Sequence, residues 1–197
     1  MIRNVVFDLG NVLVEFKPKS YLESLGITDS ENLSQLIFKD PRWNEFDRGT
    51  LLIEDYVNDL KRENPNYAQC FDMIFCENWA SKLFKPKEKS IEFLKTQVFP
   101  NYKIYILSNV SQYVLNYIKT LDFFPYVTSG TYSYQVKSCK PEEEIYHKFF
   151  KENQVAPQEC LFLDDLPANI ETAKRLGMSG IVFNDNIEEI VDYLKNM

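Results

Sequence analysis

The sequence predicts an α/β protein, with a Rossmann-like, doubly wound parallel sheet as its core and an all-helical cap domain inserted near the N-terminus. Three short apolar runs, 5–7, 104–107 and 161–163, support the sheet. Unbroken runs of β-branched, aliphatic and aromatic residues are typical of strands buried on both faces. Each run stops at a polar residue, and these residues are Asp8, Ser108, and the pair Asp164 and Asp165. Ligands of open α/β sheets bind beyond the carboxyl ends of the strands, so we expect these side chains to meet at one edge.

Strands and helices alternate from residue 86 onward, which predicts right-handed crossovers between parallel strands. Apolar residues at helical spacing, such as Val114, Leu115 and Ile118, support the helices, and Gly177 marks the end of one of them. The expected strands are 4–8, 103–108, 126–129, 160–164 and 180–183, and the expected helices are 87–97, 110–121, 142–152, 168–176 and 187–196.

The segment 16–84 contains no convincing strand and has the pattern of a helical insertion. Ser30 precedes a helical stripe of apolar residues and is a candidate N-cap. The helices expected in this segment are 20–25, 29–38, 53–62 and 67–79. We therefore expect a catalytic core made of residues 1–15 and 85–197, and a cap made of residues 16–84.

Composition excludes several classes of function. The 197 residues carry a net charge of −7, which argues against nucleic acid as a partner because phosphate backbones are bound through a surplus of Lys and Arg. No apolar run approaches the ~20 residues that span a bilayer, and no signal-peptide pattern is present, so we expect a cytoplasmic protein without a membrane partner. The four cysteines form no CxxC pair, which favours reduced thiols. The oligomeric state is not readable from the sequence.

The acidic residues at the strand ends suggest phosphate and metal chemistry. Asp8 could attack phosphorus or bind a metal, although a loop or cap role is the commoner one for a single strand-end Asp. Asp164 and Asp165 repel each other unless a cation lies between them, and Mg²⁺ prefers carboxylate and water ligands. An N-cap for the following helix explains one of these two residues more readily than both.

Two other positions could bind an anion at the same edge. Ser108 and Asn109 precede a helix, whose N-terminal N–H groups and polarity attract phosphate, while a simple N-cap fits equally well. Lys140, before Pro141, could neutralise a phosphate and the attacking carboxylate, although a single Lys at such a position is usually a surface residue.

These motifs occur in the order D-x-G-x-V, S-N, K-P and D-D-x-x-x-N, beginning at residues 8, 108, 140 and 164. In this order and spacing the chain resembles the haloacid dehalogenase superfamily of hydrolases over nearly its whole length. Each motif is weak alone, and the four together are specific. The strings FDLGNV at 7–12 and FLDD at 162–165 look most similar to the bacterial sugar-phosphatase branch that includes α-D-glucose-1-phosphate phosphatase.

The resemblance implies a role for each matching residue. Asp8 would form an aspartyl-phosphate, and Lys140 would pair with Asp8 and the phosphate. Ser108 and Asn109 would hold phosphate oxygens. The Mg²⁺ ligands would be Asp8, the Gly10 carbonyl, Asp165 directly and Asp164 through water.

Two further features of the sequence affect the expected activity. Many phosphatases of the family carry a second Asp at the position of Gly10, where it protonates the leaving group, and Gly cannot do so. We expect a slow phosphatase, one that prefers good leaving groups, or an acid supplied by the cap or the substrate. The polar cap segment 46–50 resembles a recurring cap segment that can face the active site, and there Arg48 would bind the substrate. A surface turn with Gly49 as a helix stop is as good an interpretation.

The expected function is Mg²⁺-dependent hydrolysis of a small phosphate monoester, with a sugar phosphate the leading substrate. One alternative is a metal-independent haloacid dehalogenase, which the acidic pair disfavours because it would repel an anionic substrate. The other alternative is a non-catalytic protein that binds a phosphate ligand, which Gly10 favours.

Overall fold

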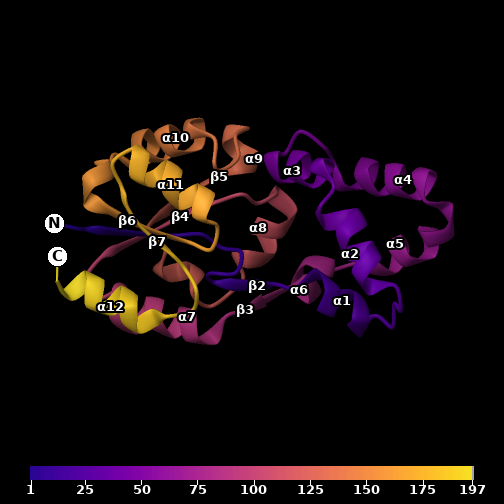
Figure 1. Cartoon of the computed structure of the whole chain (residues 1–197), viewed down its shortest axis with the longest axis horizontal. Coiled ribbons are helices and arrows are strands. Elements are labelled where there is room, and N and C mark those ends of the chain that lie inside the picture. The colour runs from indigo at the N-terminus through magenta and orange to yellow at the C-terminus, as the bar shows by residue number, and fades with distance from the viewer. Residues whose placement is uncertain (197) are drawn as a thin grey trace.

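The computed structural model describes residues 1–196, and its centre is a five-stranded sheet in which every neighbouring pair is parallel (Figure 1). The strand order is β5-β4-β1-β6-β7. The strands are β1 (Asn4–Phe7), β4 (Lys103–Ser108), β5 (Ser129–Tyr132), β6 (Cys160–Asp164) and β7 (Ser179–Val182). The order runs outward in both directions from β1, which is what a doubly wound sheet requires. This arrangement confirms the predicted fold class.

Helices cover both faces of the sheet because each strand sends alternate side chains to opposite sides. Val6 and Phe162 pack in one apolar cluster with helices α10 (Glu143–Asn153) and α11 (Pro167–Arg175). Val5 and Leu161 pack on the other side. There the covering helices are α7 (Glu88–Phe93) with its π-helical continuation Leu94–Val98, α8 (Gln112–Ile118) and α12 (Ile187–Lys195). None of the helices within residues 1–196 has both the length and the hydropathy to cross a membrane.

A two-stranded antiparallel ribbon joins the sheet to a separate group of helices. It pairs β2 (Val14–Phe16) with β3 (Phe84–Pro86), and the rings of Phe16 and Phe84 stack with centroids 5.2 Å apart. The helices between the two strands lie on the side of the molecule away from both termini (Figure 1). They are α1 (Pro18–Ser24), α2 (Ser30–Phe38), α3 (Pro41–Arg48), α4 (Ile53–Glu63), α5 (Ala68–Ile74) and α6 (Trp79–Leu83).

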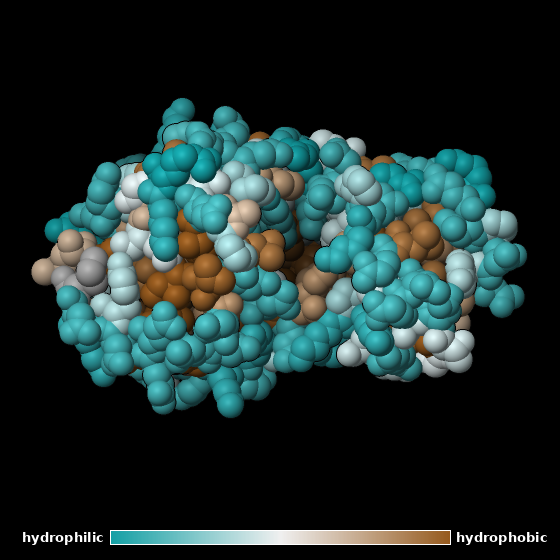
Figure 2. All heavy atoms as spheres, viewed as in Figure 1, coloured by the Kyte–Doolittle hydropathy of each residue, from teal (hydrophilic) through white to brown (hydrophobic). Residues whose placement is uncertain are grey.

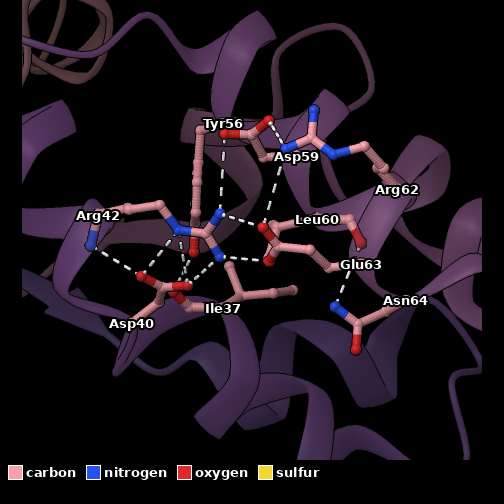
Figure 3. A network of polar contacts seen from close by, with 9 residues as sticks. All are labelled: Ile37, Asp40, Arg42, Tyr56, Asp59, Leu60, Arg62, Glu63 and Asn64. Atoms are coloured by element: carbon pink, nitrogen blue, oxygen red, sulfur yellow. Dashed lines mark hydrogen bonds and ion pairs between the residues drawn. The ribbon is translucent and has the colours of Figure 1, made fainter.

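Helix α3, which the sequence patterns did not reveal, is stabilised at both ends. Asp40 is its N-cap and accepts a hydrogen bond from the backbone N–H of Arg42, while Gly49 ends it in the left-handed conformation with φ 70°. The Arg42 guanidinium also contacts Asp40 at 2.6 Å and Glu63 of α4 at 2.8 Å, and so ties α3 to α4 (Figure 3). Segment 46–50 is therefore a helix end, not a free turn.

Several other elements differ from the expected ones. The strand expected at 126–129 begins only at Ser129, because residues Phe124–Tyr126 around Pro125 form a 3-10 turn. The helix expected at 67–79 is divided, since Asn78 adopts φ 61° between α5 and α6. Strand β3 and the short helix α9 (Ser133–Val136) had no sequence signal of their own.

Candidate functional site

The parallel strands bring the predicted acidic residues to one point. Asp8 directly follows β1, and Asp164 ends the neighbouring strand β6, with Asp165 next in the chain. One carboxylate oxygen from each of the three residues lies within 4.8 Å of the others. The register explains this proximity, since Phe7 lies opposite Leu163 and both strands end at the same edge of the sheet.

A buried lysine lies among these carboxylates. Lys140 Nζ is 2.8 Å from Asp8 Oδ1 and 2.6 Å from Asp164 Oδ2, and the lysine side chain is only 1% exposed. Burial lowers the pKa of Lys140, but the charges of Asp8 and Asp164 raise it by a larger amount. The pKa of Lys140 therefore lies above its ordinary value. The lysine is therefore charged and partly compensates the acidic cluster.

Asp164 and Asp165 differ in how many hydrogen bonds their carboxylate oxygens already accept. Asp164 is fully buried, and its oxygens accept hydrogen bonds from Lys140 Nζ, from Asn169 Nδ2 and from the backbone N–H of Leu166. Asp165 is half-buried, and one of its oxygens accepts from Asn11 Nδ2 at 2.9 Å. Asp165 is thus the better placed of the two for direct contact with a metal.

The site fits a divalent cation. Burial raises the pKa of Asp8 to about 6, an effect that Lys140 reduces and the charge of Asp164 increases. Asp8 Oδ1 makes the ion pair with Lys140, but this buried oxygen receives no hydrogen bond from the described residues. Three carboxylates around one ammonium group leave a surplus of negative charge, and an oxygen donor set of this kind suits Mg²⁺.

Asn109 and Ser108 lie beside the acidic cluster in different roles. Asn109 Nδ2 donates to the carbonyl of Lys140 at 2.9 Å, and its Oδ1 accepts from the N–H of Lys140 at 2.7 Å. Both Nδ2 and Oδ1 of Asn109 therefore help to position Lys140. The resemblance had implied a different role for Asn109, namely contact with phosphate oxygens. Ser108 is buried at the end of β4 and lines the adjacent cavity.

Arg48, expected to bind substrate, is not brought to this cluster. Its guanidinium forms an ion pair of 2.6 Å with Glu142 and donates to the carbonyl of Lys137. This pairing lowers the pKa of Glu142 to about 2. Arg48 therefore joins α3 to the loop before α10, and the preceding residue, Asp47, faces the site in its place.

A cavity of about 100 Å³ lies between the acidic edge of the sheet and α3. Most of its walls are apolar, and Asp47, Ser108 and Asn109 supply the polar side chains. The surface is hollowed between the part that holds the sheet and the part that holds α1–α6, with hydrophobic atoms visible inside (Figure 2). The lining residues are Leu9, Gly10, Val14, Phe16, Trp43, Asp47, Phe84, Ser108, Asn109, Val110, Val114 and Ile118.

Sequence reasoning assigned no role to Asn11, Asn169 or Asp47, which the structure places at the site. Asn11 adopts φ 55° and reaches Asp165, and its Oδ1 accepts from the backbone N–H of Phe16 at the end of β2. Asn169 is the last residue of the fourth motif, D-D-x-x-x-N. Its Nδ2 donates hydrogen bonds to the carboxylate of Asp164, which explains why an Asn suits this position of the motif. Asp47 lies within segment 46–50, which the sequence singled out. Only the rotation of α3 about its axis shows that Asp47, and not Arg48, faces the cavity.

Known proteins share the sequence pattern of this chain. A family model described as haloacid dehalogenase-like hydrolase matches residues 2–177. The chain is 25% identical to a D-ribitol-5-phosphate phosphatase from Bacteroides thetaiotaomicron, covering 90% of this chain and 89% of that one. It is also 25% identical to a phosphorylated carbohydrates phosphatase from Thermotoga maritima, covering 90% and 82%.

A solved structure shares the fold. It is a HAD family enzyme from Bacteroides thetaiotaomicron in complex with magnesium and inorganic phosphate, with a TM-score of 0.74 at 20% identity, covering 94% of this chain and 96% of that one. The family match spans most of the chain and includes all four motifs. This chain belongs to the haloacid dehalogenase-like hydrolases, which confirms the predicted family and the predicted hydrolytic enzyme.

Proposed function

We propose that the protein is a Mg²⁺-dependent phosphatase that hydrolyses a small phosphate monoester through an aspartyl-phosphate on Asp8. The observation that carries this proposal is the convergence of Asp8, Asp164 and Asp165 around the buried Lys140. Such a set binds a cation and a phosphate together, whereas the three carboxylates alone would repel an anionic substrate. The phosphatases among its relatives support a phosphoric monoester hydrolase.

In this proposal Asp8, the carbonyl of Gly10 and Asp165 hold the metal, and Asp164 acts through a water molecule. The bound Mg²⁺ would polarise the phosphoryl oxygens and offset the negative charge that develops on them. Asp8 attacks phosphorus, Lys140 neutralises both its carboxylate and the phosphoryl group, and Ser108 donates to a phosphoryl oxygen. Asn109 and Asn169 keep Lys140 and Asp164 in place through the hydrogen bonds described above.

The substrate is proposed to be a compact phosphate ester, with phosphorylated sugars and polyols first. Two relatives named for phosphatase activity on such compounds support this choice. The cavity of about 100 Å³ is well below the roughly 300–1,000 Å³ of typical ligand pockets, which favours a small leaving group over a flavin or a nucleotide. We also propose that residues 16–84 form a cap domain over a core of residues 1–15 and 85–197, since the ribbon of β2 and β3 is the natural hinge.

The test is a phosphate-release screen over sugar phosphates, polyol phosphates and aryl phosphates, run in Mg²⁺ and in EDTA. We expect release only with Mg²⁺, and loss of release in Asp8→Asn, because the amide cannot attack phosphorus. Asp192→Asn is the matched control, since Asp192 is an exposed residue of α12. Release of chloride from a haloacid in EDTA, or no turnover of any ester, would overturn the proposal.

A further inference from the structure

The site lacks an obvious source for the proton that an alkoxide leaving group needs. Gly10, two residues after Asp8, has no side chain to supply it. Lys140 is held between Asp8 and Asp164, and Ser108 is a very weak acid. Among the described residues that line the cavity, Asp47 is the only one with an ionisable side chain.

Asp47 is held facing the cavity from the cap side. It lies in the last turn of α3, four residues after Trp43, so the two side chains share one face of the helix and both line the cavity. Its Oδ1 accepts a hydrogen bond from the N–H of Ser111 at 3.2 Å, and its carbonyl accepts from Ser133 Oγ at 2.6 Å. These bonds fix the carboxyl group against the N-terminus of α8.

The cations near Asp47 are engaged elsewhere. Arg48 pairs with Glu142, and Lys137 Nζ donates to the carbonyl of Gly49 at 2.6 Å. Burial and the nearby charge of Asp8 raise the pKa of Asp47 well above its ordinary value, an effect that the bond from Ser111 only partly offsets. A half-buried carboxyl group without a cationic partner retains its proton and can donate it, as catalytic acids of this type do.

We propose that Asp47 is the general acid and base of this enzyme, supplied by the cap in place of the Asp that many relatives carry at the position of Gly10. The inference rests on the proposed phosphatase function. In the first step Asp8 Oδ bonds to phosphorus, the bond from phosphorus to the leaving oxygen breaks, and that oxygen takes the proton of Asp47. In the second step the Asp47 carboxylate accepts a proton from water, the water oxygen bonds to phosphorus, and the bond from phosphorus to Asp8 breaks. Asp47 is then protonated again, and phosphate leaves.

The test compares Asp47→Asn with the wild type in single-turnover reactions on aryl and alkyl phosphates. An aryl leaving group needs no proton, whereas an alkoxide does. We therefore expect formation of the aspartyl-phosphate to slow by about 10²–10⁴-fold for the alkyl phosphate and far less for 4-nitrophenyl phosphate. In steady state, 4-nitrophenyl phosphate should give a burst of nitrophenol followed by slow turnover, because water then attacks without a base. Asn keeps an oxygen to accept the Ser111 bond, and Asp55→Asn, an exposed residue of α4, is the matched control.

A second variant separates loss of the acid from damage to the cap. An added Cβ at Gly10 would meet nothing within 4 Å, so the backbone leaves room for the first side-chain atom of Gly10→Asp in the Asp47→Asn protein. We expect this double variant to recover turnover of the alkyl phosphate. In single-turnover reactions, an equal slowing of aspartyl-phosphate formation from the aryl and the alkyl phosphate in Asp47→Asn would overturn the role of Asp47 while leaving the phosphatase proposal intact. Absence of turnover in the wild type would instead refute the phosphatase proposal itself.

Discussion

At the scale of single residues, the site depends on one cation placed between carboxylates. Lys140 is buried between Asp8 and Asp164, and each contact is short enough for a direct ion pair. A pair of unit charges about 4 Å apart is worth roughly 4 kcal/mol at an effective dielectric constant of 20. Removal of the lysine therefore leaves buried charges that the surrounding protein cannot solvate.

Replacement of Lys140 should reveal this dependence even without a substrate. We expect Lys140→Met to lower the free energy of unfolding by about 3–5 kcal/mol in EDTA, because it leaves Asp8 and Asp164 without their partner. Added Mg²⁺ should restore part of the loss by supplying another cation to the same carboxylates. Thermal unfolding with and without Mg²⁺ measures both effects, and Lys148→Met, on the half-exposed side of α10, is the control. An equal loss in EDTA and in Mg²⁺ would speak against a metal site beside Lys140.

At the scale of the elements, helix α3 positions Asp47 and is itself fixed by charges at its other end. Arg42 contacts Asp40 and Glu63, and its guanidinium lies 5.4 Å from the ring centre of Tyr56 (Figure 3). The Tyr56 hydroxyl donates to the carbonyl of Ile37 at 2.6 Å, which adds α2 to the same network. The network holds the N-terminal end of α3 against α2 and α4.

The ionic part of this network predicts an effect of pH. Arg42 lowers the pKa of Asp40, so the pair stabilises the fold at neutral pH and loses its effect as the pH falls through the lowered pKa. We expect Arg42→Gln to cost about 1 kcal/mol at pH 7 and less below pH of about 4. Urea unfolding at pH 7 and pH 3 tests this, with Lys174→Gln, at an exposed residue of α11, as the control. The same cost at both pH values would contradict it.

At the scale of the whole molecule, the end of α3 is joined to the sheet-bearing part by several bonds. Arg48 pairs with Glu142, Lys137 donates to the carbonyl of Gly49, and Ser133 donates to the carbonyl of Asp47. All three are made where the end of α3 meets segment 133–142, away from the ribbon of β2 and β3 (Figure 1). In the proposed function these bonds would hold the cap closed over the acidic residues, and Arg48 would act on substrate binding through the position of the cap.

Loss of the Arg48 ion pair should therefore loosen the closed cap. We expect Arg48→Gln to speed amide hydrogen exchange at residues 47–51 and 111 and to raise KM, while global stability falls by less than about 1 kcal/mol because the pair is partly exposed. Exchange followed by mass spectrometry measures the first effect, and Lys174→Gln is again the control. Unchanged exchange at these residues would show that the ion pair does not hold the cap.

The fold was readable from the sequence because its signals are local. Buried parallel strands leave apolar runs such as 104–107 and 161–163, and the residue that ends each run is fixed by strand geometry. Asp8, Asp164 and Asp165 could be grouped for the same reason. The strand prediction was least accurate at β5. This strand begins later in the chain than expected because the residues around Pro125 form a 3-10 turn.

The sequence by itself determined the parallel sheet, the helical insertion and the acidic edge, because strand ends and helical spacing are patterns along the chain. Tertiary structure alone decided which side chains share the site. In the folded chain Arg48 pairs with Glu142, and Asp47 lines the cavity. The side-chain amide of Asn109 forms hydrogen bonds with the backbone of Lys140. These choices depend on how α3 is rotated and on which loops meet across distances of up to a hundred residues in the sequence. No local pattern records such contacts, since they arise only when the cap packs against the sheet.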